Sequence, residues 1–414
     1  MRNFQSVGQI RSMNQSEIRN PKSEIHNPQS AIRKVCVVIT ARPSYSRIKT
    51  AMEAIQRHPN LQLQLVVGAS ALLERYGPVV DVIRADGFEP NAVVYMVVEG
   101  ENLVTTAKST GMGVVELATI FDNLKPDVVI SVADRYETMA TAIAASYLNI
   151  PLAHVQGGEV TGSIDEKVRH AVTKLANLHF VANRGAAERV IRMGEDPETV
   201  FVTGCPSVDL AARVLSDERN GFNPFPSYGG VGQPFDPRQG YLVVMQHPVT
   251  TEYEDALRQI QETLAAVETL AYPTFWFWPN VDAGSDRISK GIRHFRETHD
   301  VPFIYFFKNM SPEDFLRLLI GSKCLVGNSS VGIRESSYLG VPIVNIGNRQ
   351  GGRDRGPNVI DVGYERKAIV EGVQLHLANG RYPSNTLYGD GRAGERIAHL
   401  LTTVPLIIEK RITY

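Results

Sequence analysis

The sequence has few cysteines, little excess charge of either sign and no long hydrophobic run. Three cysteines in 414 residues cannot form a disulfide framework, which favours a reducing compartment. A formal net charge of −1 provides no overall field that would attract nucleic acid or an anionic membrane. No apolar stretch reaches the ~20 residues that span a bilayer, and the N-terminus lacks the apolar core of a signal peptide. We therefore expect a soluble cytoplasmic protein with neither nucleic acid nor membrane as partner.

Length and composition predict two globular domains. Hydrophobic residues make up 43% of the chain and charged residues 21%, which is ordinary for packed cores. Because one core seldom serves more than about 200 residues, a chain of 414 residues is expected to divide. Residues 1–33 are polar and repeat a short motif, as in Glu17-Ile18-Arg19-Asn20-Pro21 and Glu24-Ile25-His26-Asn27-Pro28. This segment cannot build a core, so we predict a disordered extension.

From Lys34 onward, short β-rich runs alternate with helical stretches. The runs are almost continuously apolar, which is typical of parallel strands buried on both faces, and the stretches between them are long enough for crossover helices. Residues 34–221 are predicted to form a doubly wound α/β domain. Its expected strands are Val35–Thr40, Leu61–Val67, Ala92–Val98, Asp127–Val132, Pro151–Val155 and His179–Ala182.

A segment rich in proline and glycine, residues 222–238, is predicted to be the linker between the domains. Residues 239–414 repeat the alternation and are expected to form a second Rossmann-like domain, whose last helix could pack back on the first. The expected strands here are Tyr241–Met245, Thr274–Trp278, Pro302–Phe306, Cys324–Val326, Pro342–Ile346 and Val359–Val362. Two such domains leave a ligand cleft at the carboxyl ends of their strands.

Polar residues gather where these strands end. Arg42 precedes a helix start at Pro43 and Ser44, an arrangement that suits phosphate and equally suits a solvated arginine at a turn. Ser329 and Ser330 stand at the first turn of a predicted helix, where we expect them both to cap the helix and to bind a diphosphate. The loop from Gly347 to Arg353 could close over an anion or be a plain surface loop. For Glu166 and Arg169 we expect an ordinary surface salt bridge.

An ordered set of these motifs resembles the hydrolysing UDP-N-acetylglucosamine 2-epimerases, which include bacterial sialic acid pathway enzymes and the epimerase domain of a mammalian bifunctional epimerase/kinase. The resemblance covers about Lys34 to the C-terminus. Each motif alone is weak, but their order and spacing match throughout. The motifs are Ala133-Asp134-Arg135, His154 to Glu159, Ile164-Asp165-Glu166 with Arg169-His170, Gly204-Cys205-Pro206-Ser207, Gln246-His247-Pro248, Pro279 to Ser285 and Gly327-Asn328-Ser329-Ser330.

The resemblance implies a GT-B fold, with a UDP-sugar held between two Rossmann-like domains. It also implies conversion of UDP-N-acetylglucosamine and water to N-acetylmannosamine and UDP through a glycal, with no metal or other cofactor. The implied catalytic residues are Asp134, Glu159, Asp165 and His247. Those implied to bind substrate are Arg42, Ser46, Arg135, Gln156, His170, Asn280, Asp282, Ser329, Ser330, Glu335 and Arg349.

This sequence departs from the family pattern at Gln156 and Ala133, and also at Ala41 and Pro43, the neighbours of Arg42. Gln156 stands where the mammalian enzyme has a glutamate, and Ala133 replaces the usual glycine before Asp134. Removing a C2 proton and returning one to the other face requires two proton-handling groups, and an amide cannot exchange a proton at useful pH. We therefore expect Glu159 or Asp165 to take the role that Gln156 cannot.

Other functions stay open at this point. A substrate that is a UDP-2,4-diacetamido-trideoxyhexose, as used for legionaminic acid, would need changes only around C4 and C6. A non-hydrolysing epimerase, a retaining glycosyltransferase or a nucleotide-sugar sensor without catalysis would share the cleft. Relatives of this kind imply a homodimer or homotetramer, without identifying an interface.

Overall fold

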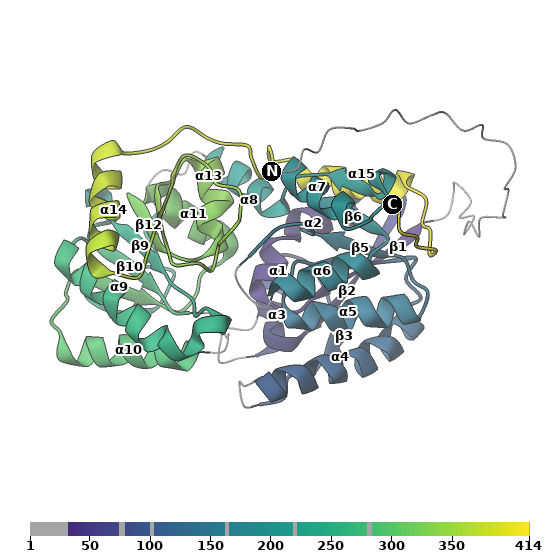
Figure 1. The fold of residues 1–414 in the computed structure, drawn as a ribbon, viewed down its shortest axis with the longest axis horizontal. Helices are drawn as coiled ribbons and strands as arrows, with labels where there is room; N and C mark the ends of the chain where they lie inside the picture. Colours follow the sequence, from purple (N-terminus) through teal and green to yellow (C-terminus); the bar gives the residue numbers. More distant parts are fainter. Residues whose placement is uncertain are drawn as a thin grey trace, which may run out of the picture.

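A computed structural model describes residues 32–73, 79–99, 103–161, 165–217, 222–279 and 284–413. Two seven-stranded sheets form the cores of two lobes, which lie side by side in Figure 1. We call these the first lobe and the second lobe, in chain order. All but the last two residues of the predicted extension lie outside the described residues, and so do Asn280 and Asp282.

The first sheet is parallel, in the order β3-β2-β1-β4-β5-β6-β7. Every residue of β4 and β5 is buried, because helices cover both faces of the sheet. This explains why these strands are apolar at consecutive positions. The strands are β1 (Arg33–Ile39), β2 (Leu61–Gly68), β3 (Ala92–Val94), β4 (Val128–Val132), β5 (Leu152–Val155), β6 (Leu178–Val181) and β7 (Val200–Val202).

Helices cover the first sheet in two layers. On one face, the core contains apolar residues of α2 (Lys49–Arg57), α3 (Val79–Ala85) and α15 (Ala393–Thr403). On the other face it contains residues of α4 (Leu103–Leu124), α5 (Tyr136–Tyr147) and α6 (Asp165–Leu175). The short α1 (Arg42–Ser46) follows β1, and α7 (Arg184–Arg192) follows β6.

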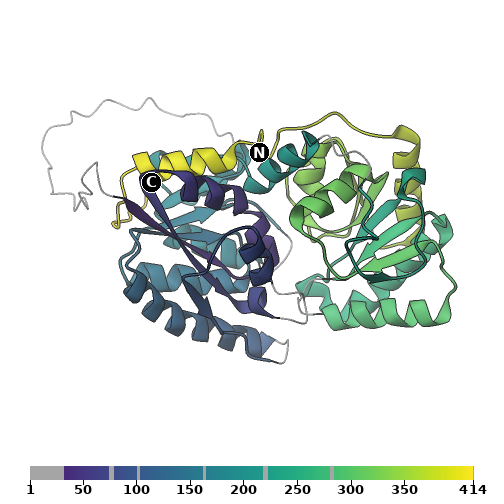
Figure 2. The same ribbon diagram turned by 180° about the vertical axis from the view of Figure 1, so that it is seen from behind.

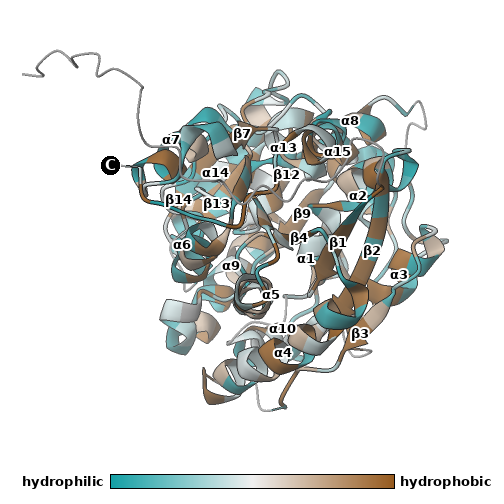
Figure 3. Ribbon diagram, turned by 90° about the vertical axis from the view of Figure 1, so that its right-hand side faces the viewer, coloured by the Kyte–Doolittle hydropathy of each residue, from teal (hydrophilic) through white to brown (hydrophobic). Residues whose placement is uncertain are grey.

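The second sheet has the order β14-β13-β12-β9-β10-β11-β8 and is parallel except for β8, which pairs antiparallel with β11. In the first lobe, which faces the viewer in Figure 3, the hydrophobic colouring concentrates on the strands of the sheet. The strands are β8 (Gly230–Val231), β9 (Leu242–Met245), β10 (Thr274–Phe277), β11 (Ile304–Phe307), β12 (Cys324–Gly327), β13 (Ile343–Ile346) and β14 (Val359–Val362).

The helices of the second lobe also form two layers. Apolar residues of α9 (Ala256–Leu270), α10 (Ser285–Thr298) and α14 (Arg366–Asn379) share one core cluster. The opposite cluster contains residues of α8 (Pro206–Leu215), α11 (Pro312–Gly321) and α13 (Glu335–Leu339). Short helical turns, η5 (Thr250–Asp255) and α12 (Ser330–Ile333), lie between strands and these helices.

Two helices connect the lobes, because each packs in the lobe that does not contain the elements preceding it in the sequence. Leu210 and Val214 of α8, which follows the first sheet in sequence, contribute to a core cluster of the second lobe. Conversely, Ile397 and Leu401 of α15 contribute to the core of the first lobe. In the view from behind, the yellow α15 lies beside the purple α2 (Figure 2).

The predicted α/β class with two Rossmann-like parallel sheets is confirmed. Each predicted strand overlaps an observed one, but Ala92–Val98 was predicted too long, since β3 ends at Val94. The strands β7 and β8 were not predicted. β8 lies within the predicted linker, where Phe225 and Phe235 also pack against the second lobe, whereas the domain boundaries themselves stay a prediction.

Candidate functional site

A pocket between the lobes is lined by residues that follow strands of both sheets. From the first lobe come Arg42 after β1 and Asp134 after β4, and from the second His247 after β9 and Ser329 after β12. The carboxyl ends of parallel strands in each sheet therefore meet at one cleft, as predicted. Also lining it are Ser46, Arg47, Arg135, Thr161, Asp165, Ser330, Arg334, Glu335, Arg349, Gln350 and Arg353.

Asp134 is held as a carboxylate among arginines. Its Oδ2 pairs with the Arg169 guanidinium, and its Oδ1 lies 3.5 Å from Nη1 of Arg47. Burial alone would raise the pKa of Asp134, but Arg169, Arg47 and Arg353 outweigh burial and hold this pKa well below its usual value. The side chain is therefore an anion throughout the neutral pH range.

The predicted salt bridge between Glu166 and Arg169 is present, but its predicted surface location is wrong because Arg169 is buried. Its side chain has 0% exposure. Besides Asp134, it donates from Nη1 to the Glu159 carbonyl oxygen at 2.8 Å and to the Glu166 carboxylate at 2.7 Å. The three-residue spacing between Glu166 and Arg169 allows this pair on one helix, as the sequence indicated. The sequence could not show that Arg169 would also pair with Asp134 and be buried there.

Glu159 joins the two lobes. Its Oε2 lies 3.1 Å from Nη1 of Arg334 and 3.1 Å from Nη2 of Arg353, and all three side chains are almost fully buried. Burial would raise the pKa of Glu159, but Arg353, Arg334 and other arginines lower it below the usual value. Glu159 is not among the residues that line the pocket.

Gln156 lies behind the pocket wall rather than in it. Its Nε2 donates to Sγ of Cys205 at 2.7 Å, and its Oε1 accepts from Arg334 at 3.4 Å. The backbone of Gln156 has φ +69°, and that of Ala133 has φ +66°. This left-handed conformation costs a non-glycine residue roughly 1–2 kcal/mol and explains the preference for glycine before Asp134.

His154 supports the Ala133 peptide from the core. Its Nε2 lies 2.9 Å from the Ala133 carbonyl oxygen, and its Nδ1 lies 3.1 Å from Oγ1 of Thr173. Burial lowers the pKa of His154 to about 3, so the ring is neutral. A neutral ring that donates from Nε2 accepts at Nδ1, which satisfies both contacts.

In the second lobe, Asn328 organises the strand ends. It accepts from the His247 backbone N–H at 2.7 Å and donates to the His247 carbonyl oxygen at 2.8 Å. The Asn328 carbonyl oxygen in turn accepts from Arg349 at 3.2 Å and from Gln350 at 2.9 Å. One asparagine thus fixes His247 and the Arg349 segment relative to each other.

The predicted serine cap is wrong in its local detail. Ser329 occupies the N-cap position of α12, but its hydroxyl makes no cap hydrogen bond. Ser330 instead accepts from Arg47 at 3.0 Å and from Arg334 at 2.9 Å. Both serines line the pocket, as does Glu335, whose buried Oε2 has no hydrogen-bond partner within the described structure.

The other predicted site residues divide into two groups. Arg42, Ser46, Arg135 and Asp165 line the pocket; burial lowers the pKa of Arg42 to about 10, which leaves it a cation. His170 does not line the pocket, and its Nε2 lies 2.9 Å from the Glu166 carboxylate. Sequence reasoning did not single out Arg47 or Arg334 and considered Arg353 only as part of a loop that could close over an anion, because only the fold brings these three arginines together.

Two negative observations concern the described residues. Across these ranges, no group of three or more His, Cys, Asp or Glu side chains is placed to hold a metal ion. Within the same ranges, no helix is both long and apolar enough to cross a membrane.

Comparison with known proteins decides the family. The profile of the UDP-N-acetylglucosamine 2-epimerase family matches residues 53–402. The chain belongs to this family. It is 34% identical to the UDP-N,N'-diacetylbacillosamine 2-epimerase (hydrolyzing) of Legionella pneumophila, over 91% of this chain and 97% of that protein. It is 27% identical to the UDP-N-acetylglucosamine 2-epimerase of Neisseria meningitidis, over 89% of this chain and 95% of that protein.

Solved structures show the same architecture. The Neisseria meningitidis UDP-GlcNAc 2-epimerase bound to UDP-GlcNAc has a TM-score of 0.73 at 17% identity, covering 89% of this chain and 99% of that one. The Methanocaldococcus jannaschii enzyme in complex with UDP-GlcNAc and UDP has a TM-score of 0.72 at 19% identity, covering 89% and 99%. This member of the family therefore has the GT-B fold.

Proposed function

We propose that the chain is a hydrolysing 2-epimerase that converts UDP-N-acetylglucosamine and water to N-acetylmannosamine and UDP. The observation that carries the proposal is the composition of the cleft. Asp134 and Asp165, from the first lobe, line the same pocket as Ser329, Ser330 and Arg349, from the second. Carboxylates suited to moving protons thus face hydroxyl and guanidinium groups suited to a diphosphate.

The reaction needs both kinds of group. A base removes the proton from C2 while UDP leaves C1, which gives a glycal. Water then adds to C1, and C2 receives a proton on the opposite face. Each positioned acid or base contributes about 10² to 10⁴ in rate, and cationic donors stabilise the charge that develops on the leaving diphosphate.

We assign the proton transfers to Asp134 and Asp165. Asp134 lines the pocket and is ionised, as a group that accepts the C2 proton must be, and its arginine partners make it a weaker base than a free carboxylate. Asp165 begins α6 and lines the pocket, as Asp134 does, whereas Glu159 stands outside the lining and pairs with Arg334 and Arg353 of the other lobe. Asp165 is therefore the better candidate for the role that Gln156 cannot take. Glu159 is better suited to holding the two lobes together.

A second substrate is favoured by one comparison. The Legionella relative, at 34% identity, acts by name on UDP-N,N'-diacetylbacillosamine. The same two proton transfers at C2 would convert that 2,4-diacetamido sugar, so the cleft chemistry is shared. The substrate is therefore a UDP-2-acetamido sugar, and the groups at C4 and C6 distinguish the two candidates.

The decisive experiment incubates the protein with each UDP-sugar in deuterated water and follows the proton NMR spectrum. Free UDP together with a 2-epimerised sugar deuterated at C2 is expected. A labelled UDP-sugar without free UDP would contradict hydrolysis. Binding without label from either substrate would contradict the enzyme assignment and leave a sensor.

Variants test the assigned residues in the same assay. Asp134→Asn and Asp165→Asn are each expected to lower kcat about 10²-fold or more, with UDP affinity within a few-fold of wild type. Full turnover by Asp165→Asn together with loss of turnover in Glu159→Gln would transfer the proton-handling role to Glu159.

A further inference from the structure

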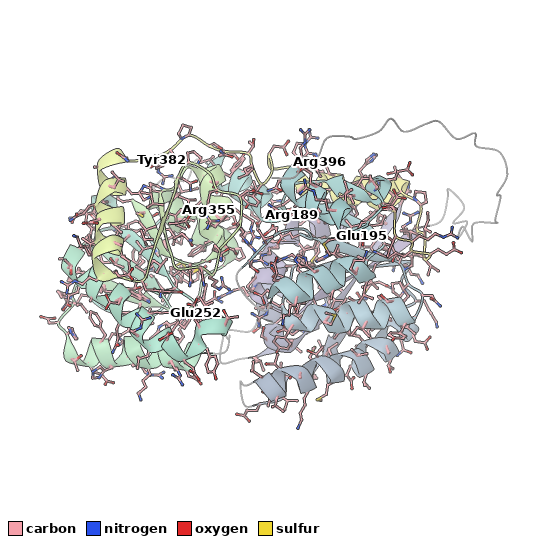
Figure 4. The ribbon with its side chains drawn as sticks, in the orientation of Figure 1. Arg189, Glu195, Glu252, Arg355, Tyr382 and Arg396 are labelled. Atoms are coloured by element: carbon pink, nitrogen blue, oxygen red, sulfur yellow. The ribbon has the colours of Figure 1, made fainter. Side chains whose placement is uncertain are left out.

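Glu252 lies outside the pocket lining, yet its carboxylate collects donors from three separate segments. Oε1 accepts a hydrogen bond of 2.5 Å from Nδ2 of Asn348, a residue that follows β13. Oε2 accepts a hydrogen bond of 2.9 Å from the hydroxyl of Tyr364, a residue that follows β14. Oε2 also accepts one of 2.8 Å from Nε2 of Gln259, which lies on α9. In Figure 4, Glu252 lies in the lower part of the second lobe, above α10 and on the side near the first lobe.

The segment held by Glu252 leads directly into the cleft. Asn348 immediately precedes Arg349 and Gln350, which line the pocket and donate to the Asn328 carbonyl oxygen. Gly347 has φ +70°, and a Cβ at this position would lie 2.3 Å from the Tyr364 hydroxyl. Close packing and two side-chain hydrogen bonds therefore fix the start of the segment against Glu252 and Tyr364.

The other end of the same segment is held independently. Arg355 donates from Nη1 to the carbonyl oxygens of Gln350, at 2.9 Å, and Arg353, at 2.6 Å. Its remaining donors pair with Asp361 on β14. Glu252 and Arg355 are labelled at separate places on the second lobe in Figure 4. Loss of Glu252 would thus remove the side-chain contact at Asn348, while the contacts of Asn328 and Arg355 with the rest of the segment persist.

Glu252 also lies close in sequence to another part of the cleft. It is five residues after His247, at a kink in η5 where its own φ and ψ are −127° and 23°. Asn328 hydrogen-bonds both His247 and the Arg349 segment. The segment that follows β9 and the segment that follows β13 are therefore connected twice, once through Asn328 and once through Glu252.

We propose that Glu252 is a positioning residue that holds the segment Gly347–Arg353 so that Arg349 faces the diphosphate of the nucleotide. The inference rests on the proposed function for the identity of that ligand. Glu252 acts through Arg349 and does not touch the nucleotide itself. It therefore affects the binding of UDP more than the proton transfers at the sugar.

The test uses the full chain with the substitution Glu252→Gln. The amide keeps the size of the side chain but presents an NH₂ group to donors, so contacts with Asn348, Tyr364 and Gln259 cannot all persist. The expected results are a rise of about tenfold in the Kd for UDP by calorimetry and a kcat within about threefold of wild type. A merely structural role would leave the Kd for UDP unchanged once the protein is folded.

A double-mutant cycle separates positioning from general damage. In an Arg349→Ala background, Glu252→Gln is expected to change the Kd for UDP by less than about twofold, because the residue it positions is gone. Additive effects of the two substitutions would overturn the proposal. The matched control is Gln259→Met, which removes a donor on α9 but keeps the contact between Glu252 and Asn348. It is expected to leave UDP affinity unchanged.

A ligand-free measurement completes the test. Amide hydrogen exchange in residues 347–353 is expected to accelerate in Glu252→Gln and not in Gln259→Met. Unchanged exchange in Glu252→Gln would overturn the positioning role whatever the reaction is. UDP binding by the wild type without turnover would contradict only the proposed function, whereas no UDP binding at all would contradict both.

Discussion

Arginine side chains set the charge of the cleft wall. Arg169, Arg334 and Arg353 are almost fully buried, and each pairs with a carboxylate of the first lobe. A buried charge is tolerated only when it is paired, so the arginines and the carboxylates depend on each other. Removing one arginine therefore changes both stability and the protonation of the remaining acid.

Arg169→Met is expected to destabilise the fold by about 3–5 kcal/mol, because it leaves Asp134 buried without its strongest partner. The pKa of Asp134 will rise, since Arg169 is the largest charge that lowers it. Asp134 will then become protonated at a higher pH, and the acid limb of the kcat/KM profile will move upward. Urea unfolding and pH–rate profiles measure the two effects.

The control for this prediction is Arg258→Met, which removes an exposed arginine paired with Asp255 at 3.6 Å. Exposed pairs contribute about 0–1 kcal/mol, so stability and pH profile should stay close to wild type. An acid limb that does not move in Arg169→Met would show that Asp134 does not govern it.

The buried carboxylate of Glu195, which is not among the residues that line the pocket, should make the stability of the fold depend on pH. It accepts from Lys174 at 2.7 Å, lies 3.0 Å from Nε2 of His179 and pairs with Lys410; Figure 4 labels it on the first lobe. Burial would raise the pKa of Glu195, but these partners lower it from 4.5 to about 2. A depressed folded-state pKa stabilises the fold above the unfolded pKa, and this stabilisation is lost as the pH falls from about 4.5 to about 2.

Glu195→Gln should remove this dependence. Over that pH range the free energy of unfolding of the wild type should fall more steeply than that of the variant, by up to about 1.4 kcal/mol per pH unit for one proton. Urea titrations at a series of pH values measure both slopes. Equal slopes in the two proteins would mean that the pKa of Glu195 is not lowered in the folded state. The control is Glu395→Gln, which removes one partner of an exposed ion pair with Arg392 and should keep the wild-type slope.

At the scale of elements, α15 depends on a close approach to α2. A Cβ on Gly394 would lie 2.6 Å from the backbone carbon and oxygen of Thr50. Asp209 of α8 accepts from the backbone N–H groups of Ala393 and Gly394, at 2.9 Å and 2.7 Å. The start of α15 is therefore fixed by backbone contact on one side and by a carboxylate on the other.

Gly394→Ala is expected to destabilise the protein by about 1–3 kcal/mol, because the added methyl group forces α15 away from α2. The same substitution at Gly111, inside α4 with no atom within 4 Å of a new Cβ, should instead stabilise by about 0.5–1 kcal/mol. The urea concentrations at the unfolding midpoints of the two variants and the wild type measure both effects. A stable Gly394→Ala protein would mean that α2 and α15 separate without cost.

The sequence predicted elements well where burial is continuous. Runs such as that of β4 are apolar at every position because both faces are covered, and their ends were predicted to within about a residue or two. β7 was missed because it is a short edge strand with no fully buried residue, and β8 because two residues between glycines and prolines carry no periodicity. Interlobe pairs such as Glu159 with Arg334 depend on the docking of two domains, which no local pattern encodes.

At the scale of the whole molecule, the C-terminal segment completes the first lobe. Ile397, Ala398 and Leu401 are buried in its core, and Arg33 donates to the Val404 carbonyl oxygen at 3.2 Å. Lys410 pairs with Glu195 on the same lobe. This segment therefore belongs structurally to residues that lie more than 200 positions earlier in the chain.

Deletion of residues 390–414 is expected to give an aggregating protein without cooperative unfolding. The deletion exposes the apolar surface of α2 and the first sheet that α15 covers. Size-exclusion chromatography and urea unfolding monitored by near-UV circular dichroism measure the outcome. A soluble truncated chain with the wild-type unfolding midpoint would show that α15 is dispensable.

The placement of α15 also has a consequence for biosynthesis. A ribosome releases a chain from its N-terminus, and domains commonly fold as they emerge. The first sheet is synthesised early, but one of its covering helices ends at Thr403. About 200 residues are translated between the end of the first sheet at Val202 and the end of α15 at Thr403, and over that interval this face of the nascent lobe is left open to chaperones.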